Sequence, residues 1–258
     1  MTHQGLALLL VTGVLTGLLN TLAGGGSFLS MPMLIFLGQS PGVANGTNRL
    51  AIVAQNLSGV WGFHRYQALP WRWAGWTVLP TALGSLAGTW LALATPDSQL
   101  RRLLAVFMAT ITLWTLISSR RGPSQDDSGG AGAAEPPAFP RGARRWLVQL
   151  GFFASGIYGG FIQAGVGFLL LAVLSFAGLD LVRANAVKVL AILVNSLIAL
   201  PGFILAGRVE WLPGLVLALG TMVGARWGVR LTILKGQRWL RWVVTVAVLL
   251  CAIKLWLG

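Results

Sequence analysis

Four cationic side chains lie within otherwise apolar stretches of the sequence, where an isolated charge is costly in hydrocarbon surroundings. They are Arg49, Lys188, Arg226 and Lys254. Arg226 and Lys254 lie beside glycines or near segment ends, from which a long side chain can reach the membrane surface. Arg49 and Lys188 lie a turn or two inside their segments. Each therefore suits the binding of a negatively charged ligand, with snorkelling to the membrane surface as the alternative.

Polar side chains and glycines accompany these two cations. The candidate ligand-binding side chains are Asn48, Ser27, Gln55, Gln163 and Asn195, with Asn20, Asn45, Asn56, Asn185 and Ser196 as further polar groups. Some of these groups will only bridge helices, which is the ordinary use of polar residues in membranes. Asn45 and Asn185 fit that use best, because each begins the same predicted helix in its half of the chain and suits an N-cap.

Glycines interrupt the apolar sequence near the same positions. Gly24, Gly25 and Gly26 are consecutive, and Gly165 and Gly167 occur in the second half of the chain. Bare backbone N–H groups at broken helix ends form a cradle for anions, so we expect Gly25, Gly26, Gly165 and Gly167 to contact the ligand. Close helix packing better explains the glycines with i,i+4 spacing. These are Gly84, Gly88, Gly224 and Gly228.

Acidic and nucleophilic groups are scarce in the apolar segments. Asp97, Asp180 and Glu210 all lie at segment ends, and the chain has two histidines and one cysteine. This argues against metal clusters, paired-carboxylate hydrolysis and Ser-His-Asp triads, so the sequence predicts neither an enzyme nor a bound cofactor or metal. It also lacks the buried carboxylate of a proton-coupled pump. A site built from cations and amides suits a small anion.

The composition is that of a polytopic all-α membrane protein. Of the 258 residues, 55% are hydrophobic and 10% are charged, whereas soluble domains carry about 25% charged residues. The predicted apolar segments are 5–22, 26–38, 43–64, 72–94 and 99–118, then 145–162, 166–178, 183–204, 212–234 and 239–257. The net charge of +13 fits membrane orientation better than nucleic-acid binding, because no basic and aromatic groove accompanies it.

The segments recur at a constant offset of 140 residues. Gly25, Phe28 and Leu29 fall on Gly165, Phe168 and Leu169, and residues 44–52 resemble 184–192. We interpret this as two homologous transmembrane repeats, 1–118 and 145–258, joined by a flexible cytoplasmic linker at 119–144. Secondary transporters are commonly built from such repeats, with the substrate at the repeat interface.

Lysine and arginine counts predict the orientation of the repeats. With the linker in the cytoplasm and an odd number of crossings in each repeat, 12 of these residues lie on the cytoplasmic side and 3 on the other. An even number of crossings gives 8 and 7. The positive-inside rule therefore favours inverted repeats with both termini outside. Residues 5–38 form either a pair of short helices or a re-entrant hairpin with Gly24–Gly26 at its tip.

Three motifs resemble the TauE/SafE (TSUP) family of sulfite exporters. They are AGGGSFLSMPML at 23–34, ANGTNRLAIVAQNLSG at 44–59, and QAGVGFLLLAVLSFAGLDLVRANAVKVLAILVNS at 163–196. The resemblance implies transport of sulfur-containing anions, such as sulfite or sulfoacetate, across the bacterial cytoplasmic (inner) membrane. The second half departs from the glycine run, since Ala164 and Val166 alternate with Gly165 and Gly167. The two halves are therefore expected to contribute unequally.

Together these observations predict an alternating-access transporter, working as an exporter, in which Arg49 and Lys188 neutralise the anion. A passive anion channel is the alternative, and it would carry polar residues along a whole helix face. A membrane-embedded enzyme would need a nucleophile or metal site that the sequence lacks. The expected partners are the small anion and the lipid bilayer. Spare glycine faces and Trp-rich helix ends also suit a homodimer.

Overall fold

The chain folds into α-helices throughout the part that the structure describes. The computed structural model describes the backbone of residues 3–22, 24–119 and 137–257, and the side chains of these residues except 108–109, 111–119 and 235–257. The helices are α1 (His3–Leu22), α2 (Ser27–Phe36), α3 (Pro41–Arg65), α4 (Trp71–Ala94), α5 (Asp97–Ser119), α6 (Gly142–Phe161), α7 (Val166–Phe176), α8 (Leu181–Leu205) and α9 (Trp211–Leu257). No strand occurs in these ranges, which confirms the all-α part of the predicted fold class.

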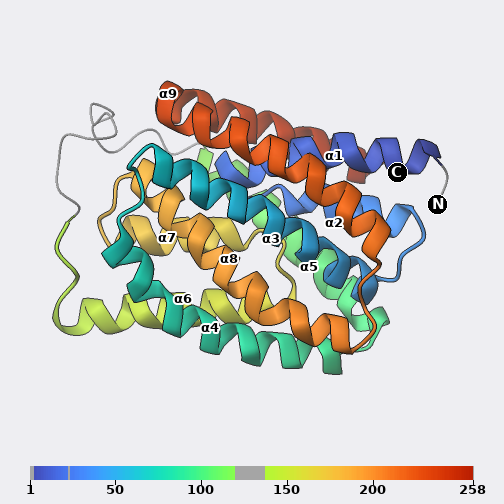
Figure 1. The fold of residues 1–258 in the computed structure, drawn as a ribbon, viewed down its shortest axis with the longest axis horizontal. Helices are drawn as coiled ribbons and strands as arrows, with labels where there is room; N and C mark the ends of the chain where they lie inside the picture. Colours follow the sequence, from blue (N-terminus) through green and yellow to red (C-terminus); the bar gives the residue numbers. More distant parts are fainter. Residues whose placement is uncertain (1–2, 23, 120–136, 258) are drawn as a thin grey trace.

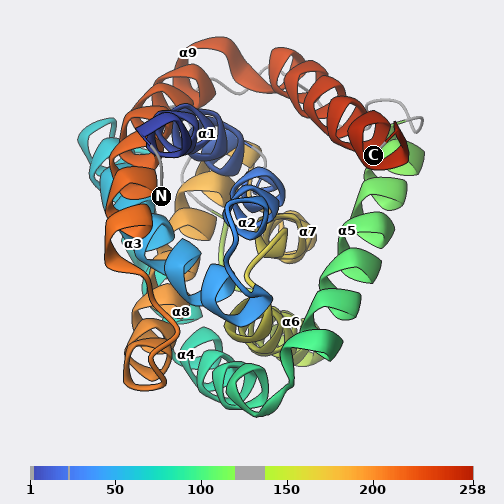
Figure 2. The same cartoon turned by 90° about the vertical axis from the view of Figure 1, so that its right-hand side faces the viewer.

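The long helices surround two short ones. Figure 2 looks along the bundle and shows α2 and α7 in its middle, with the longer helices around them. Figure 1 places α2 nearer the end that holds both chain termini and α7 nearer the opposite end. The most extensive helix contacts are those of α1 with α9, α4 with α6, α3 with α9, and α8 with both α3 and α4. The centre of the bundle is therefore formed where short helices begin.

Four helices are long and apolar enough to cross a membrane, among the residues described. They are α1, α4, α8 and residues Trp211–Leu234 of α9. Large apolar side chains face outwards from them, such as Leu79, Trp90 and Leu219, each more than 60% exposed. The polar side chains of α3, including Asn45, Asn48 and Asn56, are instead buried in the bundle. Apolar outside and polar inside is the distribution that lipid imposes.

The predicted segment 5–38 forms a helical hairpin with unequal arms. At 1.5 Å per residue, α1 is about 30 Å long, whereas α2 is about 15 Å long. In Figure 1, α2 runs back towards the end where α1 begins. Gly24, with φ of +90°, lies in the turn between the arms. The glycines thus lie at the tip of a hairpin, as the second alternative predicted. The first alternative, two short helices, is wrong for α1, which has 20 residues.

Some predicted boundaries are wrong. The segments 212–234 and 239–257 belong to one helical element, α9. The residues between them, Lys-Gly-Gln-Arg at 235–238, include no proline and three good helix formers, which favours a continuous helical element. Figure 2 nevertheless shows that α9 bends sharply along its length. Helix α6 begins at Gly142, three residues before the predicted start. Residues 120–136, most of the predicted linker, and the side chain of Lys254 lie outside what the structure describes.

The glycine spacing in α4 and α9 produces close helix packing, as predicted. A Cβ atom at Gly84 would lie 2.8 Å from the backbone nitrogen of Ile157 in α6. A Cβ atom at Gly224 would lie 2.7 Å from the backbone nitrogen of Leu18 in α1. Both contacts involve backbone, which cannot rotate away as a side chain can. Each glycine therefore sets how closely its helix pair approaches.

We expect Gly84→Ala to destabilise the protein by about 1–3 kcal/mol, because the added methyl group overpacks the α4–α6 contact. The matched control is Gly75→Ala in the same helix, where a Cβ atom meets nothing within 4 Å. That change should leave stability unchanged or raise it by up to about 1 kcal/mol through helix propensity. Thermal unfolding of the purified protein in detergent measures both. Equal melting temperatures for the two variants would contradict the packing role.

Candidate functional site

Arg49 extends from α3 to the end of α6 and is fully buried. Its Nη1 donates to Oε1 of Gln163 at 2.8 Å, and its Nη2 donates to the carbonyl oxygens of Gly159 at 3.1 Å and Gly160 at 2.5 Å. The guanidinium carbon lies 4.5 Å from the ring centre of Phe203. Its Nε has no partner. Arg49 therefore binds the last turn of α6 and retains an uncommitted donor.

Lys188 makes the corresponding contact from α8 to the end of α1. Its Nζ donates to the carbonyl oxygens of Asn20 and Thr21, both at 3.0 Å, and to Oδ1 of Asn185 at 2.7 Å. An ammonium group has three donors, so all of its hydrogen-bonding capacity is used. Lys188 is also fully buried. Its charge faces the C-terminal end of α1.

The two cations occupy equivalent places at two helix ends. Each binds the carbonyls of the second- and third-last residues of its helix, since α1 ends at Leu22 and α6 at Phe161. The last carbonyls of a helix have no partner within it, and the helix dipole places negative potential there. A cation supplies both the hydrogen bonds and the opposite charge. Neither cation has a carboxylate partner among the described residues.

The two helix breaks meet each other through glycine backbones. Gly24 and Gly167 pack so closely that a Cβ atom on either would overlap the backbone of the other. Gly165 has φ of +78°, and Gln163 has φ of +68°, a left-handed conformation uncommon for a residue with a side chain. This conformation precedes α7 and accompanies the contact of Gln163 with Arg49. The predicted glycines thus lie where α2 and α7 begin.

Asn20 connects much of the first break. Its Nδ2 donates to Oγ of Ser27 at 3.3 Å and to Oε1 of Gln55 at 3.2 Å, while its Oδ1 accepts from the backbone N–H of Gly26 at 2.8 Å. The structure therefore brings Gly26, Ser27 and Gln55 together through one side chain. Gly25 lies against the ring of Phe168 at the start of α7. One of the predicted cradle donors, the N–H of Gly26, is already bonded within the protein.

The other predicted amides lie in two separate contacts. Asn48 accepts from Oγ of Ser30 at 2.7 Å, which joins α3 to α2, and its Nδ2 has no partner. Asn195 donates to the carbonyl of Gly156 at 2.9 Å, and Gln163 donates to Oγ of Ser196 at 3.1 Å. Gln163 therefore bridges Arg49 and α8. The uncommitted donors of Asn48 and Arg49 are adjacent in sequence on α3.

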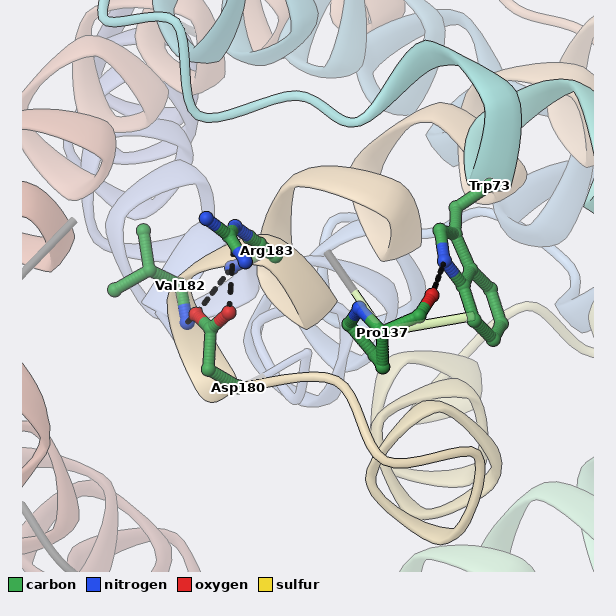
Figure 3. A network of polar contacts seen from close by, with 5 residues as sticks. All are labelled: Trp73, Pro137, Asp180, Val182 and Arg183. Carbon is green, nitrogen blue, oxygen red and sulfur yellow. Dashed lines mark hydrogen bonds and ion pairs between the residues drawn. The ribbon is translucent and has the colours of Figure 1, made fainter. Parts of the chain in front are cut away.

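The expectation that Asn45 and Asn185 cap helices is wrong. The N-cap of α3 is Ser40, and that of α8 is Asp180, whose carboxylate accepts from the backbone N–H groups of Val182 and Arg183 (Figure 3). Both helices begin earlier than predicted, which places the asparagines inside them. Asn45 donates instead to the carbonyl of Phe161, the last residue of α6, at 2.8 Å. Asn185 accepts from Lys188.

Sequence reasoning missed the carbonyl groups that hold the two cations. Backbone oxygens carry no residue signature, so Gly159 and Gly160 gave no sign of binding Arg49. A signal was nevertheless present, because each cation lies in the second helix after a glycine break. Among the described residues, no group of three His, Cys, Asp or Glu side chains could hold a metal ion. The chemistry of this centre is that of positive charge and amides.

Comparisons with known proteins agree with a membrane protein. The family described as "Sulfite exporter TauE/SafE" matches residues 9–255. The "Probable membrane transporter protein YfcA" of Escherichia coli K12 is 29% identical over 254 residues, which is 97% of this chain and 89% of that protein. A "Probable membrane transporter protein" of Haemophilus influenzae is 26% identical over 245 residues, 93% of this chain and 90% of its own. No solved structure matches the chain.

Replacing Lys188 tests its contact with α1. We expect Lys188→Met, which keeps the length of the side chain, to lower the free energy of unfolding, because each buried carbonyl left without a donor costs about 1–3 kcal/mol. Relief from burying the charge offsets part of this loss. Arg230→Met, at an exposed position on α9, controls for the loss of one positive charge. Thermal unfolding in detergent compares the two. A Lys188→Met protein as stable as the control would show that the buried ammonium group makes no net contribution to stability.

Proposed function

The chain belongs to the TauE/SafE sulfite exporter family, a family of multi-pass membrane transporters, and on this premise we propose which anion it carries and how. The proposed substrate is a small sulfur-containing anion, sulfite or an organosulfonate such as sulfoacetate. The proposed membrane is the bacterial inner membrane, with export as the direction and alternating access as the mechanism. No enzymatic step is part of this proposal.

The observation that carries the proposal is the pair of fully buried cations without carboxylate partners. Two buried positive charges favour an anion between or beside them, because a negative charge lowers the cost of their burial. Arg49 is the better direct ligand, since its Nε is uncommitted, as is Nδ2 of Asn48, the preceding residue in the sequence. Lys188, whose three donors are used, contributes its charge and holds α1 in place.

The remaining proposed site residues come from the two helix breaks and from α3 and α8. They are Gly25, Gly26, Ser27, Gln55, Gln163, Gly165, Gly167 and Asn195. Helices α2 and α7 begin here without a side-chain cap, so their N-terminal dipoles add to the attraction for an anion. An oxyanion approaching Arg49 would therefore meet amide donors and two helix N-termini.

Burial of the centre favours alternating access. Arg49 and Lys188 have no exposed surface, so a substrate reaches them only after helices move. A passive channel would keep a continuous polar path. Figure 1 places the short helices α2 and α7 towards opposite ends of the bundle, which suits a centre opened alternately from two sides.

The packing of the helices supports an inverted duplication. Helix α1 packs against α9 as α6 packs against α4. A Cβ atom at Gly17 of α1 would collide with the carbonyl of Thr221, and one at Gly156 of α6 with the carbonyl of Thr81. Thr81 and Thr221 are 140 residues apart, the offset found in the sequence. We propose that the arginine-rich end, where α4 and α6 begin, is the cytoplasmic one.

Arg49→Lys should strongly reduce anion transport while leaving the protein folded. Lysine keeps the charge but loses the planar fork and the uncommitted Nε donor. We expect uptake of radiolabelled sulfite or sulfoacetate into proteoliposomes to fall at least about tenfold, the loss of one charge-assisted hydrogen bond. Arg230→Lys is the matched control.

The competing outcomes are distinct. Unchanged transport by Arg49→Lys would remove Arg49 from the site. Single-channel conductance through the wild-type protein would show that the protein is an anion channel and not a transporter. Transport of acetate as fast as that of the sulfur-containing anions would refute the proposed substrate class.

Export should respond to membrane potential. A potential of 100 mV, negative inside, supplies about 2.3 kcal/mol for moving one monovalent anion outwards. At equilibrium this free energy corresponds to an anion concentration about 50-fold higher outside than inside. Because no Asp or Glu lies deep in an apolar segment, we expect this drive to suffice without a pH gradient. Efflux from vesicles with potassium-valinomycin potentials measures it. Efflux that needs a pH gradient and ignores the potential would contradict this drive.

A further inference from the structure

A hollow with three arginines opens between the starts of α4 and α6. Its volume is about 740 Å³, within the range of ligand sites, and Arg72, Arg141 and Arg145 line it together with Trp73, Trp76 and Phe139. We propose that this hollow binds the phosphate group of an anionic phospholipid. The proposal does not depend on the transport site, because Arg49 contacts the opposite end of α6, about 27 Å away along that helix.

The walls of the hollow are built by specific contacts. The ring of Phe139 lies 4.9 Å from that of Trp73 and 5.2 Å from that of Trp76, between centres. Nε1 of Trp73 donates to the carbonyl of Pro137 at 2.9 Å (Figure 3). These contacts fix the segment before α6 against the start of α4. The guanidinium of Arg72 lies 5.8 Å from the centre of the Phe139 ring.

The charges around the hollow are uncompensated. Arg72 lies in the first turn of α4, Arg141 is the N-cap residue of α6, and Arg145 follows in its first turns. Helix N-termini carry positive potential and favour acidic residues, but neither first turn contains one. None of the three arginines has a carboxylate partner among the described residues. An anion satisfies the arginines and both helix ends.

Neighbouring apolar surface favours a lipid over a free phosphate. Directly after Arg145, α6 exposes Trp146, Leu147 and Leu150, which are 74%, 58% and 61% exposed. Trp71, beside Arg72, is 53% exposed. A cationic hollow next to an exposed apolar helix face matches the two parts of a phospholipid, a charged head group and an acyl chain. Basic pockets between transmembrane helices recognise anionic head groups in this way.

Lipid retention by the purified full-length protein tests the proposal. Native mass spectrometry would compare binding of phosphatidylglycerol and phosphatidylcholine to the wild type, to Arg72→Gln/Arg145→Gln, and to the control Arg65→Gln/Arg230→Gln. The control removes two exposed arginines outside the hollow. We expect the wild type and the control to bind phosphatidylglycerol in preference to phosphatidylcholine. Arg72→Gln/Arg145→Gln should bind phosphatidylglycerol at least about tenfold more weakly than the wild type does.

Several outcomes would overturn the proposal. An equal loss of phosphatidylglycerol binding in the two double variants would mean that the lipid responds to general surface charge. Equal binding of phosphatidylglycerol and phosphatidylcholine would mean that the hollow does not recognise the head group. Glycerol phosphate or inorganic phosphate displacing the lipid at similar concentrations would assign the hollow to a free phosphate. If Arg72→Gln/Arg145→Gln unfolds, the single variant Arg145→Gln replaces it. Sulfite transport by the variant that is used, measured in parallel, separates failure at the hollow from failure at Arg49.

Discussion

Helix ends inside an apolar medium leave carbonyl groups that must find donors, and basic side chains supply them at four of the described helix ends. Lys188 binds the end of α1, and Arg49 binds the end of α6. Arg208 donates to the carbonyls of Ala92 and Leu93 near the end of α4, and Arg144 donates to that of the last residue of α7. Water cannot serve these groups in the hydrocarbon region. Of the two short central helices, α7 ends against such a basic side chain, whereas the last carbonyls of α2 accept from the backbone N–H groups of Leu37, Gly38 and Gln39.

This constraint connects the fold to the chemistry of the centre. A carboxylate beside Arg49 or Lys188 would compete with the helix carbonyls and neutralise the charge. Carbonyl groups satisfy the hydrogen bonds and leave the formal charge in place. The centre therefore remains positive after every donor of Lys188 is used. The same contacts that stabilise the helix ends would also create the attraction for the proposed anion.

The sequence predicted the features that follow from residue type and spacing. Arg49 and Lys188 stood out because charge is rare in apolar segments, and Gly84 and Gly224 because their spacing matches close packing. The sequence did not predict contacts made through the backbone, such as those of Gly159 and Gly160, because any residue supplies a carbonyl. Asn45 was misinterpreted because a helix start shifted by a few residues turns an apparent cap into a buried bridge between α3 and α6. Helix boundaries depend on tertiary contacts that local propensity does not contain.

The contact between Gly24 and Gly167 has a mechanical consequence. With no side chain between the two backbones, neither hairpin tip can advance without displacing the other. Packed elements of this kind change between discrete arrangements and do not deform gradually. In the proposed alternating-access mechanism, the two tips would therefore move together, and opening on one face of the membrane would be tied to closure on the other. Two glycines would in this way prevent both faces from being open at once, and thereby limit leakage.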